Sequence, residues 1–115
     1  MVVDDDTQIR DLTVTALTYC VNREVMSFED PLSAWDYIQK GNRVDIVISD
    51  VDMPQIDGFE LMSRVKQKYP EKIFIIMSGI AAYEEKSRVQ GANAFLAKPF
   101  GINDLFDIVQ HYVVA

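Results

Sequence analysis

The fold of this chain is decided by the stretch from Val44 to Leu61, which reads Val-Asp-Ile-Val-Ile-Ser-Asp-Val-Asp-Met-Pro-Gln-Ile-Asp-Gly-Phe-Glu-Leu. Its β-branched run, Ile46–Ile48, is typical of a strand buried on both faces. Turn-forming residues follow, and Pro54 cannot continue a central strand. A helical pattern then places four apolar residues on one side: Leu61, Met62, Val65 and Tyr69. Asp50 is therefore expected at the carboxyl end of a buried strand, the edge of an open α/β sheet where ligands bind.

An aspartate at a strand end is by itself more often a turn or cap residue than a reactive one. Two other places in the chain add weight to Asp50. The acidic run Asp4–Asp6 follows the apolar pair Val2-Val3, and Lys98 follows the apolar run 94–97. Each of these charged segments comes directly after a short apolar strand.

Together these motifs resemble the receiver domain of two-component response regulators, over nearly the whole chain. An acid pair follows the first strand, and Asp-x-x-Met-Pro-x-x-Asp-Gly begins at Asp50. Ser78-Gly79 follows the fourth strand and Lys98-Pro99-Phe100 follows the fifth. Any one of these motifs would be a weak signal, but their joint occurrence at these positions is very specific.

The rest of the chain alternates strand-like and helical patterns. We expect strands at 1–3, 24–28, 46–48, 72–77 and 93–97, each followed by a helix, the fourth of them weakly amphipathic over 82–90. The first helix should bury one stripe: Ile9, Leu12, Thr13, Ala16, Leu17 and Cys20. Strict alternation implies a parallel sheet with right-handed crossovers and helices on both faces. The predicted fold is therefore a doubly wound, flavodoxin-like (βα)5 α/β fold with strand order 2-1-3-4-5, in a single domain spanning 1–115.

The composition limits the environment and the partners of the chain. Its 115 residues suffice for one domain, and the formal net charge of −7 disfavours direct contact with nucleic acid or anionic lipid. No apolar run approaches the length of a membrane-spanning helix, and charge begins at Asp4, which argues against a signal peptide. With Cys20 as the single cysteine, no internal disulfide is possible. These features favour the cytoplasm.

The acidic residues predict a metal site. In the order 2-1-3-4-5 the first and third strands are neighbours, so Asp4, Asp5 and Asp50 should converge and repel one another. A hard divalent cation such as Mg²⁺ relieves this repulsion and accepts oxygen ligands. The resemblance implies that Asp5 and Asp50 ligate Mg²⁺, or Mn²⁺ in its place, directly. It further implies that Asp4 ligates through water and Asp52 through its backbone carbonyl. The simpler alternative is that the acids only favour a helix N-terminus.

The resemblance also implies the chemistry of the site. Asp50 would be the phosphoacceptor, taking a phosphoryl group from the phosphohistidine of a sensor histidine kinase or phosphotransfer protein. Phosphoryl transfer needs in-line positioning and neutralised oxygens, which Lys98 and the Ser78 hydroxyl would supply. The alternatives are that Lys98 is a solvated surface lysine and that Ser78 only caps a loop. The domain would not be an enzyme in the ordinary sense, because it would catalyse only its own phosphorylation and dephosphorylation.

Phosphorylation would be read through Ser78 and Phe95, by the same resemblance. Ser78 would move inward and Phe95 would rotate, changing the face formed by the fourth helix, fifth strand and fifth helix. That face could contact an output domain or a second copy. The alternative for Phe95 is a static core aromatic. The resemblance further implies a cis bond before Pro99 and shielding of the phosphoryl group by Ile80.

Two other function classes stay open. The segment Asp50-Val51-Asp52 also resembles the nucleophile motif of haloacid-dehalogenase-type phosphatases. Against this, Met53-Pro54 comes next, the motif lies mid-chain, and the chain is short for that fold. The second alternative is a pseudo-receiver that serves only as an interaction module, and the intact Asp50, Lys98 and Ser78 argue against it.

Overall fold

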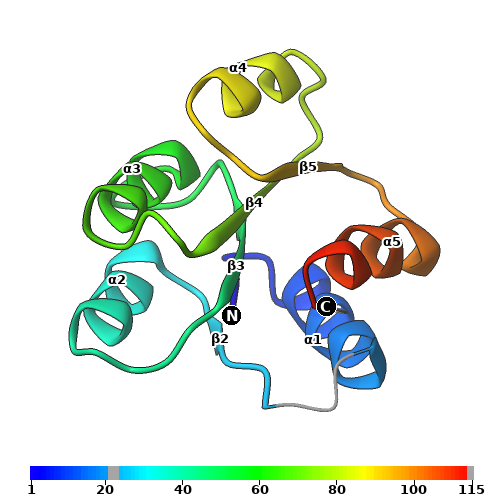
Figure 1. Ribbon diagram of the computed structural model, residues 1–115. Helices are drawn as coiled ribbons and strands as arrows, with labels where there is room; N and C mark the ends of the chain where they lie inside the picture. Colours follow the sequence, from blue (N-terminus) through cyan, green and yellow to red (C-terminus); the bar gives the residue numbers. More distant parts are fainter. Residues whose placement is uncertain (21–23, 114–115) are drawn as a thin grey trace.

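The computed structural model describes residues 1–20 and 24–113, in which five strands alternate with five helices (Figure 1). The strands are β1 (Val2–Val3), β2 (Ser27–Phe28), β3 (Ile46–Asp50), β4 (Ile73–Ser78) and β5 (Ala94–Ala97). The helices are α1 (Thr7–Cys20), α2 (Pro31–Gln39), α3 (Gly58–Lys68), α4 (Tyr83–Val89) and α5 (Ile102–Val113).

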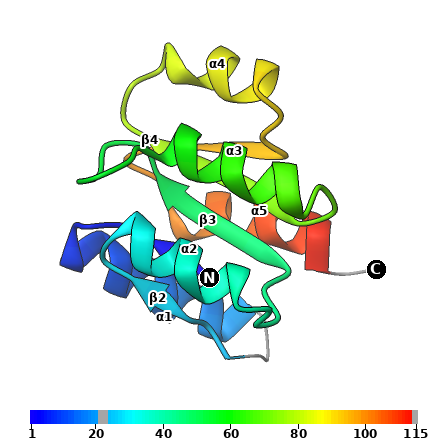
Figure 2. The same cartoon turned by 90° about the vertical axis from the view of Figure 1, so that its left-hand side faces the viewer.

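The strands form one parallel sheet in the order β2-β1-β3-β4-β5, which confirms the predicted doubly wound topology. Helices α1 and α5 cover one face of the sheet, and α2 and α3 cover the other (Figures 1 and 2). Helix α4 lies beyond α3 at the β5 edge. Parallel strands require crossovers of this kind, which place helices on both faces.

The core consists of two apolar layers separated by the sheet. On the α2/α3 side lie Val3, Val47, Phe74 and Ile76, together with side chains from both helices. On the α1/α5 side lie Val2, Ile48, Ile75, Met77 and Leu96. Successive residues of β3 and β4 therefore alternate between the two layers, and both faces of these strands are buried. This is why their sequences are continuous apolar runs rather than alternating ones.

Several predicted element ends differ from the structure by one or two residues, and two predictions differ more clearly. Strand β2 was expected over 24–28 but comprises Ser27–Phe28, because β1 supplies ladder partners only at Val2 and Val3. Leu12 was expected in the buried stripe of α1, yet 50% of it is exposed. It precedes the fully buried Thr13 by one residue, which is a rotation of about 100° around a helix. The side chain of Cys20, predicted in the same stripe, lies outside the described residues.

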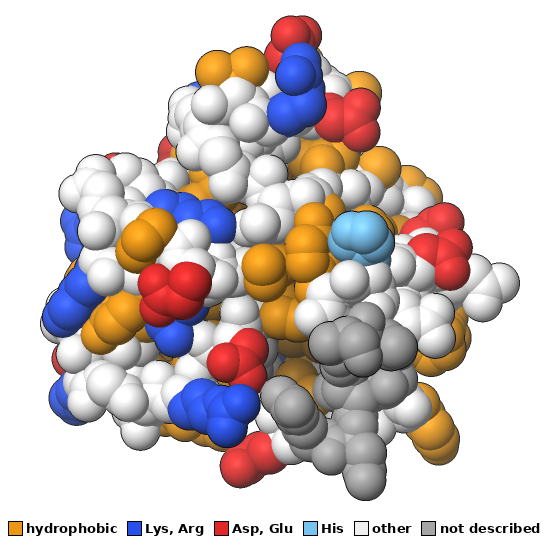
Figure 3. All heavy atoms as spheres, viewed as in Figure 1, with side chains coloured by type: hydrophobic (Ala, Val, Ile, Leu, Met, Phe, Trp, Pro, Cys, Tyr) orange, Lys and Arg blue, Asp and Glu red, His pale blue; other side chains and the backbone are white. Residues whose placement is uncertain are grey.

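The surface mixes charges of both signs. The face in Figure 3 carries basic and acidic side chains around a central area of hydrophobic atoms, with a histidine side chain beside that area. Among the described residues, no helix combines the length and apolar character needed to cross a membrane.

Candidate functional site

Three carboxylates converge at the carboxyl edge of the sheet, as the sequence predicts. Asp4 directly follows β1 and Asp50 ends β3, and these strands pair in the register Val3 with Ser49. Carboxylate oxygens of Asp4, Asp5 and Asp50 lie within 4.8 Å of one another. Asp4 is fully buried, the Asp50 side chain is 13% exposed, and Asp5 is exposed. We call these three residues the acid cluster.

Lys98 joins the acid cluster from the end of β5. Its ammonium donates to Asp4 Oδ2 at 3.1 Å and to Asp50 Oδ1 at 3.0 Å. Its backbone N–H donates to the carbonyl of Ser78 at 2.9 Å, which fixes Lys98 beside the end of β4. The peptide bond between Lys98 and Pro99 is cis, as predicted. Lys98 is therefore a bridge between two carboxylates and not a solvated surface lysine.

The charges in this site perturb one another. Burial raises the pKa of Asp50, the hydrogen bond and charge of Lys98 oppose that rise, and the Asp4 carboxylate adds to it. For Lys98, burial alone would lower the pKa, but the hydrogen bonds and charges of Asp50 and Asp4 outweigh it and raise the pKa. Lys98 therefore stays cationic, while Asp50 is a poorly solvated carboxylate that favours a further cation nearby.

Asp4 is held by contacts to its backbone as well as its side chain. Its N–H donates to the Phe28 carbonyl at 3.1 Å, and its carbonyl accepts from the Arg10 guanidinium at 2.8 Å. Its Oδ1 accepts from the Asp6 N–H at 2.9 Å. Sequence reasoning assigned Arg10 no role in the site. An available signal was its position six residues after Asp4, near the start of α1.

The loop between β3 and α3 brings the start of α3 against the backbone of Asp50. Asp57 caps α3 by accepting from the Glu60 N–H at 2.8 Å, and the Gly58 N–H donates to the Val51 carbonyl at 2.9 Å. A Cβ atom at Gly58 would lie 3.0 Å from the Asp50 carbonyl carbon and closer still to its oxygen. Only glycine permits this approach, so Gly58 allows the start of α3 to pack against the Asp50 backbone in addition to forming a turn.

Ser78 and Phe95, the two predicted switch residues, lie in β4 and β5. Ser78 ends β4, is 2% exposed, and pairs with Ala97 next to Lys98. Its hydroxyl oxygen accepts from the Ile80 N–H at 3.0 Å. Phe95 lies within β5, half-buried against the α2/α3-side core, and the Ile80 side chain is 44% exposed. Asp52 lies exposed in the loop that follows β3.

The donor set of the acid cluster suits a hard cation. It offers carboxylate oxygens, and it lies beside an exposed surface because Asp5 is exposed. Mg²⁺ prefers oxygen ligands and keeps several waters, so a partly open cluster of this kind fits it. Lys98 carries one positive charge and pairs with two of the three carboxylates, so the cluster retains negative charge that a divalent ion would neutralise.

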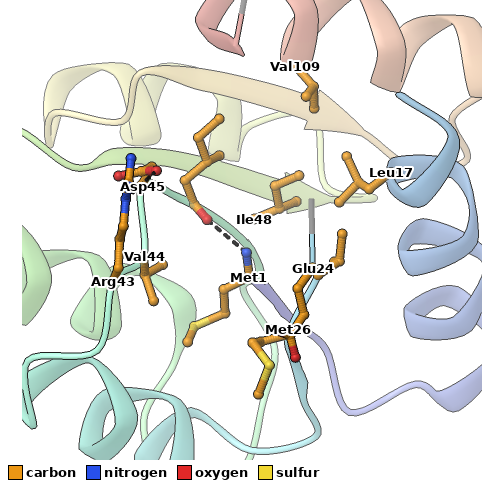
Figure 4. Close-up of a pocket in the computed structure, with 11 residues that line it drawn as sticks. Met1, Leu17, Glu24, Met26, Arg43, Val44, Asp45, Ile48 and Val109 are labelled. Carbon is orange, nitrogen blue, oxygen red and sulfur yellow. Dashed lines mark hydrogen bonds and ion pairs between the residues drawn. The ribbon is translucent and has the colours of Figure 1, made fainter. Parts of the chain in front are cut away.

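A separate cavity of about 370 Å³ lies at the opposite, amino edge of the sheet (Figure 4). It is lined mainly by residues that precede or begin strands, with Leu17 of α1 and Val109 of α5. The Met1 ammonium points into this region and donates to the Ile46 carbonyl at 2.9 Å. Burial lowers the pKa of this ammonium to about 6. The cavity has no residue in common with the acid cluster.

The sequence model of one protein family, the response regulator receiver domain, matches residues 1–110 of the chain. The chain belongs to this family. A chemotaxis protein CheY homolog from Campylobacter jejuni is 31% identical over 104 residues, which is 87% of this chain and 80% of that protein. A transcriptional regulator NtrC from Bradyrhizobium is 34% identical over 111 residues, which is 95% of this chain. The chain spans only 23% of the length of that NtrC.

Solved receiver structures agree with the fold. The chemotaxis response regulator CheY4 of Vibrio cholerae superposes with a TM-score of 0.85 at 31% identity, covering 96% of this chain and 93% of that one. The response regulator TrrA of Thermotoga maritima, solved with magnesium and beryllium fluoride, gives 0.86 at 27% identity, covering 96% and 94%. The chain is thus a two-component receiver domain and not a classical enzyme, and the phosphatase alternative is not favoured.

Proposed function

We propose that this receiver domain accepts a phosphoryl group on Asp50 from a phosphohistidine, with Mg²⁺ bound at the acid cluster. The observation that carries the proposal is the bridge from the Lys98 ammonium to Asp50 at 3.0 Å and to the buried Asp4 at 3.1 Å. This places a fixed cation against a partly desolvated carboxylate, the pair that phosphoryl transfer to an aspartate requires.

In the proposed reaction, a carboxylate oxygen of Asp50 attacks phosphorus in line with the phosphorus–nitrogen bond of the donor. The new oxygen–phosphorus bond forms as the phosphorus–nitrogen bond breaks, and the electron pair returns to the imidazole, which takes up a proton. Lys98 exchanges its contact with Asp50 for one with a phosphoryl oxygen and keeps its contact with Asp4. The Ser78 hydroxyl donates to another phosphoryl oxygen. Positioning and charge neutralisation, rather than acid–base chemistry, provide the catalysis.

Asp5 and Asp50 would hold the metal directly, Asp4 through water, and Asp52 through its backbone carbonyl. When bound, Mg²⁺ or Mn²⁺ neutralises charge on the phosphoryl oxygens. Two observations support this division of roles. Asp5 is exposed, and each carboxylate oxygen of Asp4 already accepts a hydrogen bond. Loss of the phosphoryl group by attack of water completes the cycle, so the domain acts only on itself.

The phosphorylated state would be read at the α4–β5–α5 face. Ser78 moves toward the phosphoryl group and takes the Ile80 amide with it, because the two are hydrogen-bonded at 3.0 Å. Phe95 then rotates into the space released. A ligand shifts such an equilibrium only by binding the two states unequally, which a phosphoryl group contacting Ser78 would do.

The partners follow from this chemistry. The donor is a sensor histidine kinase or a phosphotransfer protein, and the reader of the face is an output domain or a second copy of the chain. Residues 1–115 act as one receiver domain in the cytoplasm, and the net charge of −7 supports the absence of direct contact with nucleic acid or membrane.

Intact-mass analysis after incubation with acetyl phosphate and Mg²⁺ tests the proposal. The wild type should gain the mass of one phosphoryl group, and Asp50→Asn should gain none. Asp107→Asn, which changes an exposed acid on α5, is the matched control and should label like the wild type. Full labelling of Asp50→Asn would place the acceptor elsewhere, and an unlabelled wild type would favour the pseudo-receiver alternative.

A further inference from the structure

Helix α4 is attached to the rest of the molecule by few buried contacts. Ser87 is its one buried residue, and the Ser87 hydroxyl donates within the helix, to the carbonyls of Tyr83 and Glu84. Val89 is 73% exposed. An element with so little buried apolar surface responds to small changes in the contacts that remain.

The contacts that remain on the α3 side form a compact aromatic group. The rings of Phe59 and Tyr83 meet edge to face, with centroids 5.4 Å apart and an interplanar angle of 88°. The Lys86 ammonium lies 4.5 Å from the Phe59 ring centroid and 5.8 Å from that of Tyr83. Both arrangements are attractive, because ring edges and cations favour the negative face of an aromatic ring. We call Phe59, Tyr83 and Lys86 the Phe59 cluster.

Phe59 is also joined to the acid cluster through its own backbone. It is the second residue of α3 and is only 5% exposed, so its ring is fixed in the core. The residue before it, Gly58, is packed directly against the carbonyl of Asp50 and hydrogen-bonded to that of Val51. A shift of Asp50 or of the loop after it therefore displaces the first turn of α3, and the Phe59 ring with it.

We propose that the Phe59 cluster is a second connection between Asp50 and α4, acting beside the route through Ser78. The inference rests on the proposed phosphorylation of Asp50. Charge added at Asp50 displaces the loop from Val51 to Asp57, the first turn of α3 follows, and the edge-to-face contact with Tyr83 is changed. Such close packing transmits displacement because interlocked side chains do not deform continuously. Helix α4 then moves relative to α3 even where Ser78 contributes nothing.

Hydrogen exchange of the α4 amides tests this connection. Exchange is measured for the metal-free protein and for protein saturated with Mg²⁺ and beryllofluoride, a phosphoryl mimic. The response is the ratio of the two exchange rates. Phe59→Leu keeps an apolar side chain but removes the ring, and we expect the response of α4 to fall to about half of the wild-type value or less. Phe106→Leu makes the same change on the opposite face, in α5, and should leave the response unchanged.

A second variant and a labelling measurement make the test decisive. Lys86 is exposed, so Lys86→Met will fold, and it should reduce the response in the same direction as Phe59→Leu. A wild-type response in Phe59→Leu overturns the proposal; if that variant does not fold, a wild-type response in Lys86→Met does so. Labelling of Asp50 by acetyl phosphate is followed in the same samples. A labelled wild type whose α4 does not respond overturns this inference alone, whereas an unlabelled wild type overturns the proposed function and this inference with it.

Discussion

Replacing Lys98 by methionine should destabilise the metal-free domain strongly. The Lys98 side chain is 16% exposed and pairs with two carboxylates, of which Asp4 is completely buried. Removing one partner of a buried ion pair costs about 3–5 kcal/mol, because the charge left behind is neither paired nor solvated. Asp50 keeps some access to water, with 13% of its side chain exposed, so we expect about 3 kcal/mol.

The deficit should depend on pH and on Mg²⁺. Without Lys98, burial and Asp4 raise the pKa of Asp50 with little opposition. A folded-state pKa above the unfolded value gives stability that is fully present below the unfolded value of 3.8 and is lost as pH rises through the folded one. The deficit of Lys98→Met should therefore be small near about pH 4 and complete at neutral pH. Mg²⁺ at about 100 times its Kd for the Lys98→Met variant should raise the unfolding free energy of that variant by roughly 2.7 kcal/mol.

Urea unfolding followed by circular dichroism measures these free energies, at acid and neutral pH and with or without Mg²⁺. Lys40→Met is the matched control, because Lys40 pairs with Asp36 on the surface, where the side chains are 67% and 54% exposed. Exposed pairs of this kind contribute about 0.5 kcal/mol or less. If Lys98→Met loses no more stability than Lys40→Met at neutral pH, the reasoning about buried carboxylates is wrong.

Three further changes separate the parts of the site. Asp5→Ala should weaken Mg²⁺ binding at least about tenfold in a calorimetric titration while leaving the metal-free stability unchanged, because Asp5 is an exposed proposed ligand. Gly58→Ala should lower the unfolding free energy by about 2–3 kcal/mol, since its Cβ meets the Asp50 backbone, and wild-type stability would contradict the close approach. Ile80→Ala should accelerate loss of the phosphoryl group from labelled protein, and an unchanged decay rate would show that Ile80 does not exclude water.

The sequence was sufficient to predict the elements that place the site. Strands β3 and β4 are buried on both faces, so their apolar runs are continuous and end where a charged or polar residue appears. The strand order then brings the ends of β1 and β3 together, and Asp4, Asp5 and Asp50 converge as predicted. The prediction succeeded because a parallel sheet places the carboxyl ends of its strands at one edge.

The contacts that hold the site could not be predicted, because they depend on backbone approach rather than on residue pattern. The hydrogen bond from Arg10 to the Asp4 carbonyl and that from the Ile80 N–H to Ser78 are of this kind. The fit of Gly58 against Asp50 is another, since a glycine after an aspartate indicates only a turn. The pairing of Lys98 with Asp4 as well as Asp50 also requires the folded geometry.

That geometry supports different proposed roles for Asp4 and Asp5, two adjacent acids that look equivalent in the sequence. Asp4 is fully buried, and each of its carboxylate oxygens already accepts a hydrogen bond, one from Asp6 and one from Lys98. A cation bound directly to Asp4 would have to share an oxygen with one of these donors at a position that is fully buried. Asp5 is exposed, so a cation can reach its carboxylate from the solvent. Asp4 is therefore better suited to fixing Lys98 against Asp50, and Asp5 to contributing the metal-facing carboxylate. On this reasoning Asp4→Asn should disturb the position of Lys98 and the stability of the fold, whereas Asp5→Asn should affect chiefly the affinity for the cation.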